Sequence, residues 1–166
     1  VDTDDQVQWV KFSGVSWARD SSGFYYGRYQ QPAGENALKA VNEFQKVYFH
    51  RIGTPQSADV LVYDRPDQPK WIYQTDVTED GRYLTLNISE GSGALNRWFY
   101  RELGTADAPM VELIANLEAS YEYVGNDGSV FWFLTNLDAP RYRIIAIDLK
   151  APARSNWRTV VAESDA

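Results

Sequence analysis

The ten residues VTEDGRYLTL at positions 77–86 decide the fold, because their pattern recurs twice elsewhere in the chain. The other copies are WARDSSGFYY at 17–26 and VGNDGSVFWF at 124–133. Each copy joins a turn rich in Asp, Ser and Gly to a run of aromatic and apolar residues. Asp-Gly and similar pairs supply the positive φ that tight hairpins favour, so each copy predicts a β-hairpin. The turn glycines are Gly23, Gly81 and Gly128.

A second motif follows each hairpin in the same order. KVYFHRIGT at 46–54 matches RWFYRELGT at 97–105, and YRIIAIDLK at 142–150 is a looser third copy. One more short strand is expected after each copy, at 60–63, 111–114 and 157–162. Every repeat therefore contains four strands in the order strand, hairpin turn, strand, loop, strand, turn, strand.

A four-stranded antiparallel unit of about 40–50 residues has the size of a propeller blade. We therefore predict an all-β fold: a partial β-propeller in which residues 1–166 form one segment with blades at about 9–66, 69–115 and 119–162. The alternative is a meandering sandwich, whose turns fall every 8–12 residues. We favour the propeller because the repeated unit is a whole sheet. Three blades leave two free strand edges, so we expect the chain to be part of a larger ring or to self-associate to close one.

One segment of the first repeat departs from the strand pattern. GENALKAVNEFQ at 34–45 places apolar residues at Leu38, Val41 and Phe44, which favours one or two turns of helix inside a long loop. A plain loop is the alternative, and the sequence leaves both open.

The composition excludes several classes of function. The net charge is −7 and the 16 basic residues are scattered, whereas nucleic-acid binding needs a basic stripe. The chain has no cysteine, which excludes disulfides and thiolate metal sites. No apolar run approaches the ~20 residues of a membrane span. We expect a soluble protein, with the cytoplasm, the periplasm and the outside of the cell all open.

The chain offers no convincing catalytic constellation. His50 is the single histidine, and a histidine in an alternating strand is more often packed or solvated than catalytic. A nucleophile elbow reads Gly-x-Ser-x-Gly between a strand and a helix. The nearest string, GVSWA at 14–18, precedes a hairpin turn, and EGSGA at 90–94 has the wrong spacing. We therefore predict no catalytic residue in this chain.

Metal and cofactor sites are equally unsupported. The acidic runs lack the alternating oxygen ligands of a calcium loop, and no pair of carboxylates stands out as glycosidase-like. We predict no metal and no cofactor.

Asn87-Ile-Ser89 is a formal glycosylation sequon, but such triplets arise by chance and this one lies in an expected strand.

A series of short fragments resembles the prolyl oligopeptidase family over nearly the whole chain. In order they are WVKFSGVSW at 9–17, QKVYFHRIGTPQSAD at 45–59, PKW at 69–71, EDGRY at 79–83, ISEG at 88–91 with LNR at 95–97, YEY at 121–123, TN at 135–136 and YR at 142–143. Each fragment alone is weak evidence, but together and in order they are specific.

The resemblance implies a place in a larger enzyme. Members of that family carry a seven-bladed propeller over an α/β-hydrolase domain, which supplies the catalytic serine, aspartate and histidine and cleaves short peptides after proline. The propeller is thought to admit only small or unfolded chains. This chain resembles middle blades of the ring, so the implied partners are the hydrolase domain, the remaining blades and short proline-containing peptides. No catalytic residue carries over, and the segment alone should be inactive.

The resemblance also implies three residues that line the substrate cavity: Ile72, Ser89 and Ser92. Some relatives carry a methionine, an arginine and a cysteine at these positions. Ile72 could still line an apolar pocket, Ser89 removes a cationic contact, and Ser92 removes the thiol on which sensitivity to thiol reagents depends. The alternative for all three is plain strand-end and loop packing.

Two functions therefore stand. The first is a propeller portion of a post-proline-cleaving serine endopeptidase, which gates access of short peptides. The second is a non-catalytic binding or scaffold propeller fragment. A Gly-x-Ser-x-Gly motif followed by Asp and His downstream in the reading frame would favour the first. A third hypothesis, in which this chain is an enzyme by itself, has no elbow, thiol or metal cluster to support it.

Overall fold

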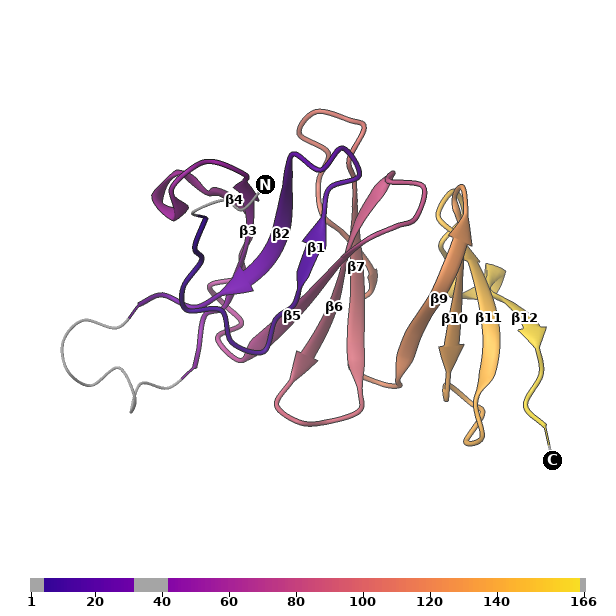
Figure 1. The fold of residues 1–166 in the computed structure, drawn as a ribbon. Helices are drawn as coiled ribbons and strands as arrows, with labels where there is room; N and C mark the ends of the chain where they lie inside the picture. The colour runs from indigo at the N-terminus through magenta and orange to yellow at the C-terminus, as the bar shows by residue number, and fades with distance from the viewer. Residues whose placement is uncertain (1–4, 32–41, 165–166) are drawn as a thin grey trace.

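The structure is a computed structural model that describes residues 5–31 and 42–164. Twelve strands form three four-stranded sheets, shown side by side in Figure 1. The first sheet contains β1 (Val15–Trp17), β2 (Gly23–Arg28), β3 (Lys46–Arg51) and β4 (Val60–Tyr63). The second contains β5 (Trp71–Val77), β6 (Tyr83–Glu90), β7 (Asn96–Glu102) and β8 (Val111–Ile114). The third contains β9 (Tyr121–Asp127), β10 (Val130–Thr135), β11 (Arg143–Asp148) and β12 (Arg158–Val161).

Within each sheet the strands lie in chain order and every neighbouring pair is antiparallel. Two 3₁₀ turns, Gln56–Ala58 and Arg154–Asn156, join the third and fourth strands of the outer two sheets. This arrangement confirms the predicted fold class of three four-stranded antiparallel units of a β-propeller. The described part of the chain forms no closed ring.

All three sheets share the same irregularity in strand pairing. The register between the third and fourth strands shifts at Val47/Tyr48, at Trp98/Phe99 and at Ile144/Ile145. A bulge bends a strand and increases its twist, so all three sheets bend at the same place. The shifts also align the sheets residue by residue, so Gln45, directly before β3, is equivalent to Asn96, the first residue of β7.

The three hairpin turns do not use their glycines alike. Gly81 and Gly128 have φ of 70° and 55°, as the Asp-Gly pairs predict. The prediction is wrong for Gly23, because in that turn Ser21 takes the positive φ of 57°. Gly23 instead begins β2 beside β3, where an added Cβ would lie 2.1 Å from the carbonyl oxygen of His50. Here glycine is required for packing rather than for the turn.

Alternating side chains pack the third sheet against the second. Phe131 and Phe133 on β10 are buried, and their rings lie 5.4 and 4.9 Å from the Trp98 ring of β7, centroid to centroid. The intervening Trp132 and Leu134 are half-buried on the opposite face. The period of two is that of strands covered on one face.

A second cluster joins the first two sheets. Val47 of β3 packs with Trp71, Tyr73, Leu86, Ile88 and Phe99 of the second sheet.

The expected helical turns at 34–45 fall mostly outside the described residues, and residues 42–45 have no regular structure.

Candidate functional site: the seam between first strands

The first strands of neighbouring sheets approach one another. The Ser16 hydroxyl of β1 donates to the Thr75 carbonyl oxygen of β5 at 2.6 Å and lies 3.0 Å from the Thr75 hydroxyl oxygen. The Gln74 amide donates to the Phe12 carbonyl oxygen at 2.5 Å, just before β1. In a propeller the blades surround a central channel, so the edge at which sheets converge faces that channel. A channel-facing site is therefore expected along the first strands.

The structure brings two of the three predicted cavity residues together. Ile72 on β5 and Ser89 on β6 are directly paired, so their half-buried side chains share one face of the sheet. Ser92 is exposed in the loop between β6 and β7, next to Gly91 with its φ of 64°. The loop glycine permits the sharp exit from β6 that separates Ser92 from the sheet face.

A cavity of about 520 Å³ lies between the second and third sheets and includes Ser89. Ile72 and Ser92 are not part of its lining. Its walls come mainly from β5, β6, the 93–96 loop end and the start of β9. The lining residues are Gln74, Thr75, Asp76, Thr85, Asn87, Ser89, Gly93, Ala94, Leu95, Asn96, Trp98, Ser120, Tyr121, Glu122 and Tyr123.

Asn96, one of the residues that line this cavity, connects the two sheets. Its side-chain oxygen accepts from the Tyr121 backbone N–H at 2.7 Å, and its side-chain nitrogen donates to the Tyr121 carbonyl oxygen at 2.9 Å. The same nitrogen donates to the side-chain oxygen of Asn87 at 2.8 Å. Gln45 acts in the same way between the first two sheets, accepting from the Tyr73 N–H at 2.5 Å. Both amides fix the position of the next sheet's first strand.

A second cavity, of about 650 Å³, continues the seam toward the hairpin turns. It shares Asp76 and Tyr123 with the first cavity and adds Arg19, Glu79 and Trp132. Burial raises the pKa of the Tyr123 hydroxyl, and the nearby carboxylates of Asp80, Asp76 and Glu79 raise it further. The phenol therefore stays protonated at neutral pH and donates to Asn126 at 2.5 Å.

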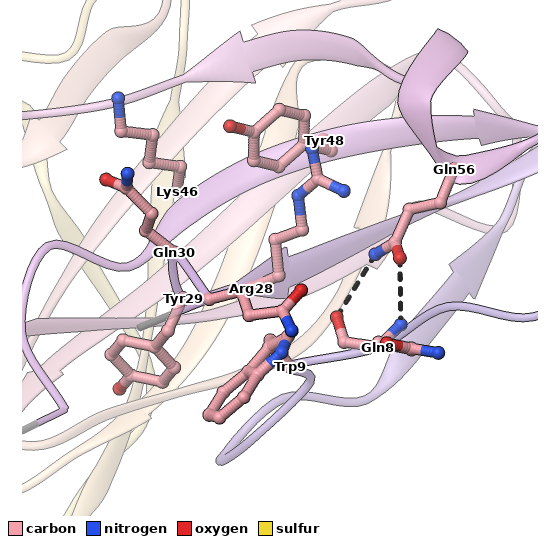
Figure 2. Close-up of a pocket in the computed structure, with 9 residues that line it drawn as sticks. Gln8, Trp9, Arg28, Tyr29, Gln30, Lys46, Tyr48 and Gln56 are labelled. Atoms are coloured by element: carbon pink, nitrogen blue, oxygen red, sulfur yellow. Dashed lines mark hydrogen bonds between the residues drawn. The ribbon is translucent and has the colours of Figure 1, made fainter. Parts of the chain in front are cut away.

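A smaller cavity of about 280 Å³ lies on the first sheet (Figure 2). The Arg28 guanidinium lies 3.8 Å from the centre of the Tyr48 ring. Gln8 and Gln56 exchange two hydrogen bonds of 3.1 Å between backbone and side chain, drawn as dashed lines in Figure 2. Tyr48 and Arg28 alternate with Val47 and Gly27, so they lie on the face that points away from the second sheet.

His50 is buried and packed rather than poised for catalysis. Its Nδ1 lies 2.7 Å from the Asp59 carboxylate, which also accepts from the Tyr26 hydroxyl. Its Nε2 has no hydrogen-bond partner among the described residues and lies 3.8 Å from the Asp5 carboxylate. A triad histidine would present this nitrogen to a serine hydroxyl. The group around His50 is therefore a structural polar cluster.

Some of these residues were missed by sequence reasoning. Asp76 stands in a strand with no motif to mark it, and Glu122 lies in the YEY fragment at 121–123, which gave no hint of its role. Gln45 and Asn96 carry a usable signal, because each is an amide directly before the basic residue that begins the second repeat motif.

Among residues 5–31 and 42–164 no group of three metal-ligating side chains is arranged around a common point. Nor does any helix there have the length and apolarity to cross a membrane.

Comparison with known proteins places these sheets in a family. All of residues 1–166 match the family described as "Prolyl oligopeptidase, N-terminal beta-propeller domain". The chain belongs to the prolyl oligopeptidase family. Prolyl oligopeptidase A of Amanita bisporigera is 35% identical over 89% of this chain, and the prolyl endopeptidase of Elizabethkingia meningoseptica is 30% identical over 97%. The match spans 20% and 22% of those two relatives, about a fifth of their length.

Solved prolyl oligopeptidases have the same fold over this region. Apo prolyl oligopeptidase B of Galerina marginata superposes with a TM-score of 0.85, at 32% identity over 98% of this chain and 22% of its own. The same fungal protein bound to a 35mer hydrolysis and macrocyclization substrate gives a TM-score of 0.84, at 32% identity over 98% of this chain and 22% of its own. The prolyl oligopeptidase family is one of serine peptidases, and this chain matches its propeller.

Proposed function

We propose that this chain is the portion of a post-proline-cleaving serine endopeptidase that walls the path of short peptides to the active site. The observation that carries the proposal is the seam at which the first strands converge, with Ser89 in the cavity between β5 and β9. The family membership supplies the chemistry, since the chain's own histidine faces carboxylates. The mechanism is exclusion, because a narrow wall of sheets keeps folded proteins from the nucleophile and limits water around it.

The blades have a defined organisation in this proposal. We place them at 9–66, 69–115 and 119–162, and we infer that an α/β-hydrolase domain and further blades of the same protein cover the free edges. Ile72 contributes an apolar surface to the substrate cavity, and Ser89 and Ser92 contribute hydroxyls. In this arrangement the segment by itself is inactive.

Hydrolysis of a chromogenic Gly-Pro peptide tests the proposal. It is measured with the intact protein that contains this chain and with residues 1–166 alone. Cleavage by the intact protein only is the expected result. Failure of both to cleave would favour a binding propeller without peptidase function, and cleavage by the 166 residues alone would contradict the absence of a catalytic triad.

A further inference from the structure

The two seams between neighbouring first strands differ in how they are closed. Between β1 and β5, Ser16 and Thr75 hydrogen-bond directly, and the Thr75 hydroxyl also reaches the Tyr25 carbonyl oxygen at 3.3 Å. Between β5 and β9 lie the cavities of about 520 and 650 Å³, which meet at Asp76 and Tyr123. The second seam therefore holds two neighbouring cavities with shared walls rather than a closed contact.

The hollow seam carries negative charge. The lining of the 520 Å³ cavity contains Asp76 and Glu122 but no Lys, Arg or His. Both acids are exposed, and neither forms a salt bridge with a described residue. Arg19, in the second cavity, directs its Nε and Nη2 to the Thr78 carbonyl oxygen at 3.1 and 3.0 Å. The 520 Å³ cavity is thus lined by one sign of charge, which focuses its field on ligands of the opposite sign, whereas the second cavity also holds the positive charge of Arg19.

The seam also offers groups that recognise an extended backbone. Within its sheet β5 pairs only with β6, and β9 pairs only with β10, so each has one edge outside the sheet ladder. Free main-chain groups on such edges bind extended peptides, but Gln45 already binds the Tyr73 N–H, Ser16 the Thr75 carbonyl oxygen and Asn96 both main-chain groups of Tyr121, so the edges contribute only outside these contacts. Asn87 and Gln74 are exposed and add side-chain amides, and the half-buried Tyr123 adds an aromatic ring.

We propose that the seam between β5 and β9 is a binding groove for an extended, positively charged peptide segment, with Asp76 and Glu122 as its anchors for Lys or Arg side chains. The inference rests on the proposed function and adds a charge preference to it. Peptides with basic residues are retained in the groove, whereas acidic peptides are repelled from it.

Direct binding to the intact protein tests this groove without relying on catalysis. The probe is a fluorescently labelled, proline-free, amidated octapeptide with two lysines, and its comparison carries glutamates at the same positions. Anisotropy is measured with Asp76→Asn and Glu122→Gln, which keep side-chain size. Asp107→Asn, an exposed acid in the β7–β8 loop away from the seam, is the matched control.

Each seam variant is expected to weaken binding of the lysine peptide about two- to fivefold, the upper part of the range for one solvent-exposed ion pair. The control is expected to bind like the unaltered protein, and the glutamate peptide is expected to bind more weakly than the lysine peptide. Equal affinities for all three variants, or no preference for the lysine peptide, would overturn the groove. Charge-dependent binding by a protein that fails to cleave Gly-Pro peptides would keep the groove and remove the proposed function.

Discussion

Gly23 is required for the close approach of β2 and β3. A methyl group there would lie 2.1 Å from the His50 carbonyl oxygen and 2.6 Å from Cζ of Phe49. Backbone cannot move aside as a flexible side chain can, so the strand pair itself would have to separate. The residue thus contributes to pairing and to the burial of His50 together.

We expect Gly23→Ala to lower the free energy of unfolding by at least about 2 kcal/mol, since overpacking against backbone leaves no low-energy rotamer to escape to. Gly104→Ala is the matched control, because nothing lies within 4 Å of its added Cβ. Its effect is expected to stay within about 0.5 kcal/mol. Urea unfolding followed by tryptophan fluorescence measures both, and similar values for the two variants would contradict the packing role.

Ser92 allows its proposed place near the substrate to be tested chemically. The side chain is exposed in the β6–β7 loop, so a cysteine there is accessible to a maleimide. We expect Ser92→Cys in the intact protein to lose kcat/KM for a Gly-Pro peptide after maleimide treatment, because the adduct would narrow the substrate path. Ser57→Cys, exposed in the 3₁₀ turn between β3 and β4, is the control. Equal inactivation of both variants would place Ser92 outside the path.

At the scale of elements, amide side chains hold each sheet to the next. Asn96 both donates to and accepts from the backbone of Tyr121 at the start of β9, while Gln45 accepts from Tyr73 in β5. These bonds are buried, and a buried backbone N–H without a partner costs more than the net value of the bond. These hydrogen bonds, here called the amide clamp, therefore fix the position of the next sheet's first strand, although each is made by a single small side chain.

Asn96→Ala is expected to cost about 2 kcal/mol of stability and to speed hydrogen exchange at the Tyr121 amide. Asn96→Asp keeps the acceptor for that amide and loses the donor, so the Tyr121 amide is expected to remain better protected than in the alanine variant. Asn116→Ala, at an exposed position between β8 and β9, is the control. Unchanged exchange at Tyr121 in Asn96→Ala would show that the clamp does not position β9.

At the scale of the whole molecule, the aromatic cores make the fold sensitive to alkaline pH. Burial raises the pKa of Tyr26 to about 12, helped by its hydrogen bond to Asp59. Burial also raises the pKa of Tyr73, Tyr121 and Tyr123. An unfolded tyrosine ionises near 10.0. Because the folded pKa is the higher, this stabilisation is complete below pH 10 and is lost as the pH rises through about 12.

We therefore expect the protein to remain folded to about pH 10 and to unfold cooperatively as the pH approaches 12. Absorbance at 295 nm reports tyrosinate, and far-UV circular dichroism reports the sheets. Both signals should change together, since the buried phenols ionise when the cores open. Ionisation of most tyrosines near pH 10 with the sheets intact would show that the cores admit water.

The repeats in the sequence determined the all-β fold and its three units of four strands, because period-two patterns and Asp-Gly turns act locally, and the family was indicated separately by the ordered fragments that resemble it. Only the tertiary structure decided that Gly23 serves packing, that His50 lies between two carboxylates, and that Asp76 and Glu122 line one hollow seam. These features depend on residues from different strands or sheets, far apart in the sequence, that only the packing brings together. Sequence motifs therefore predicted each sheet, whereas the seam between sheets follows from how their side chains pack.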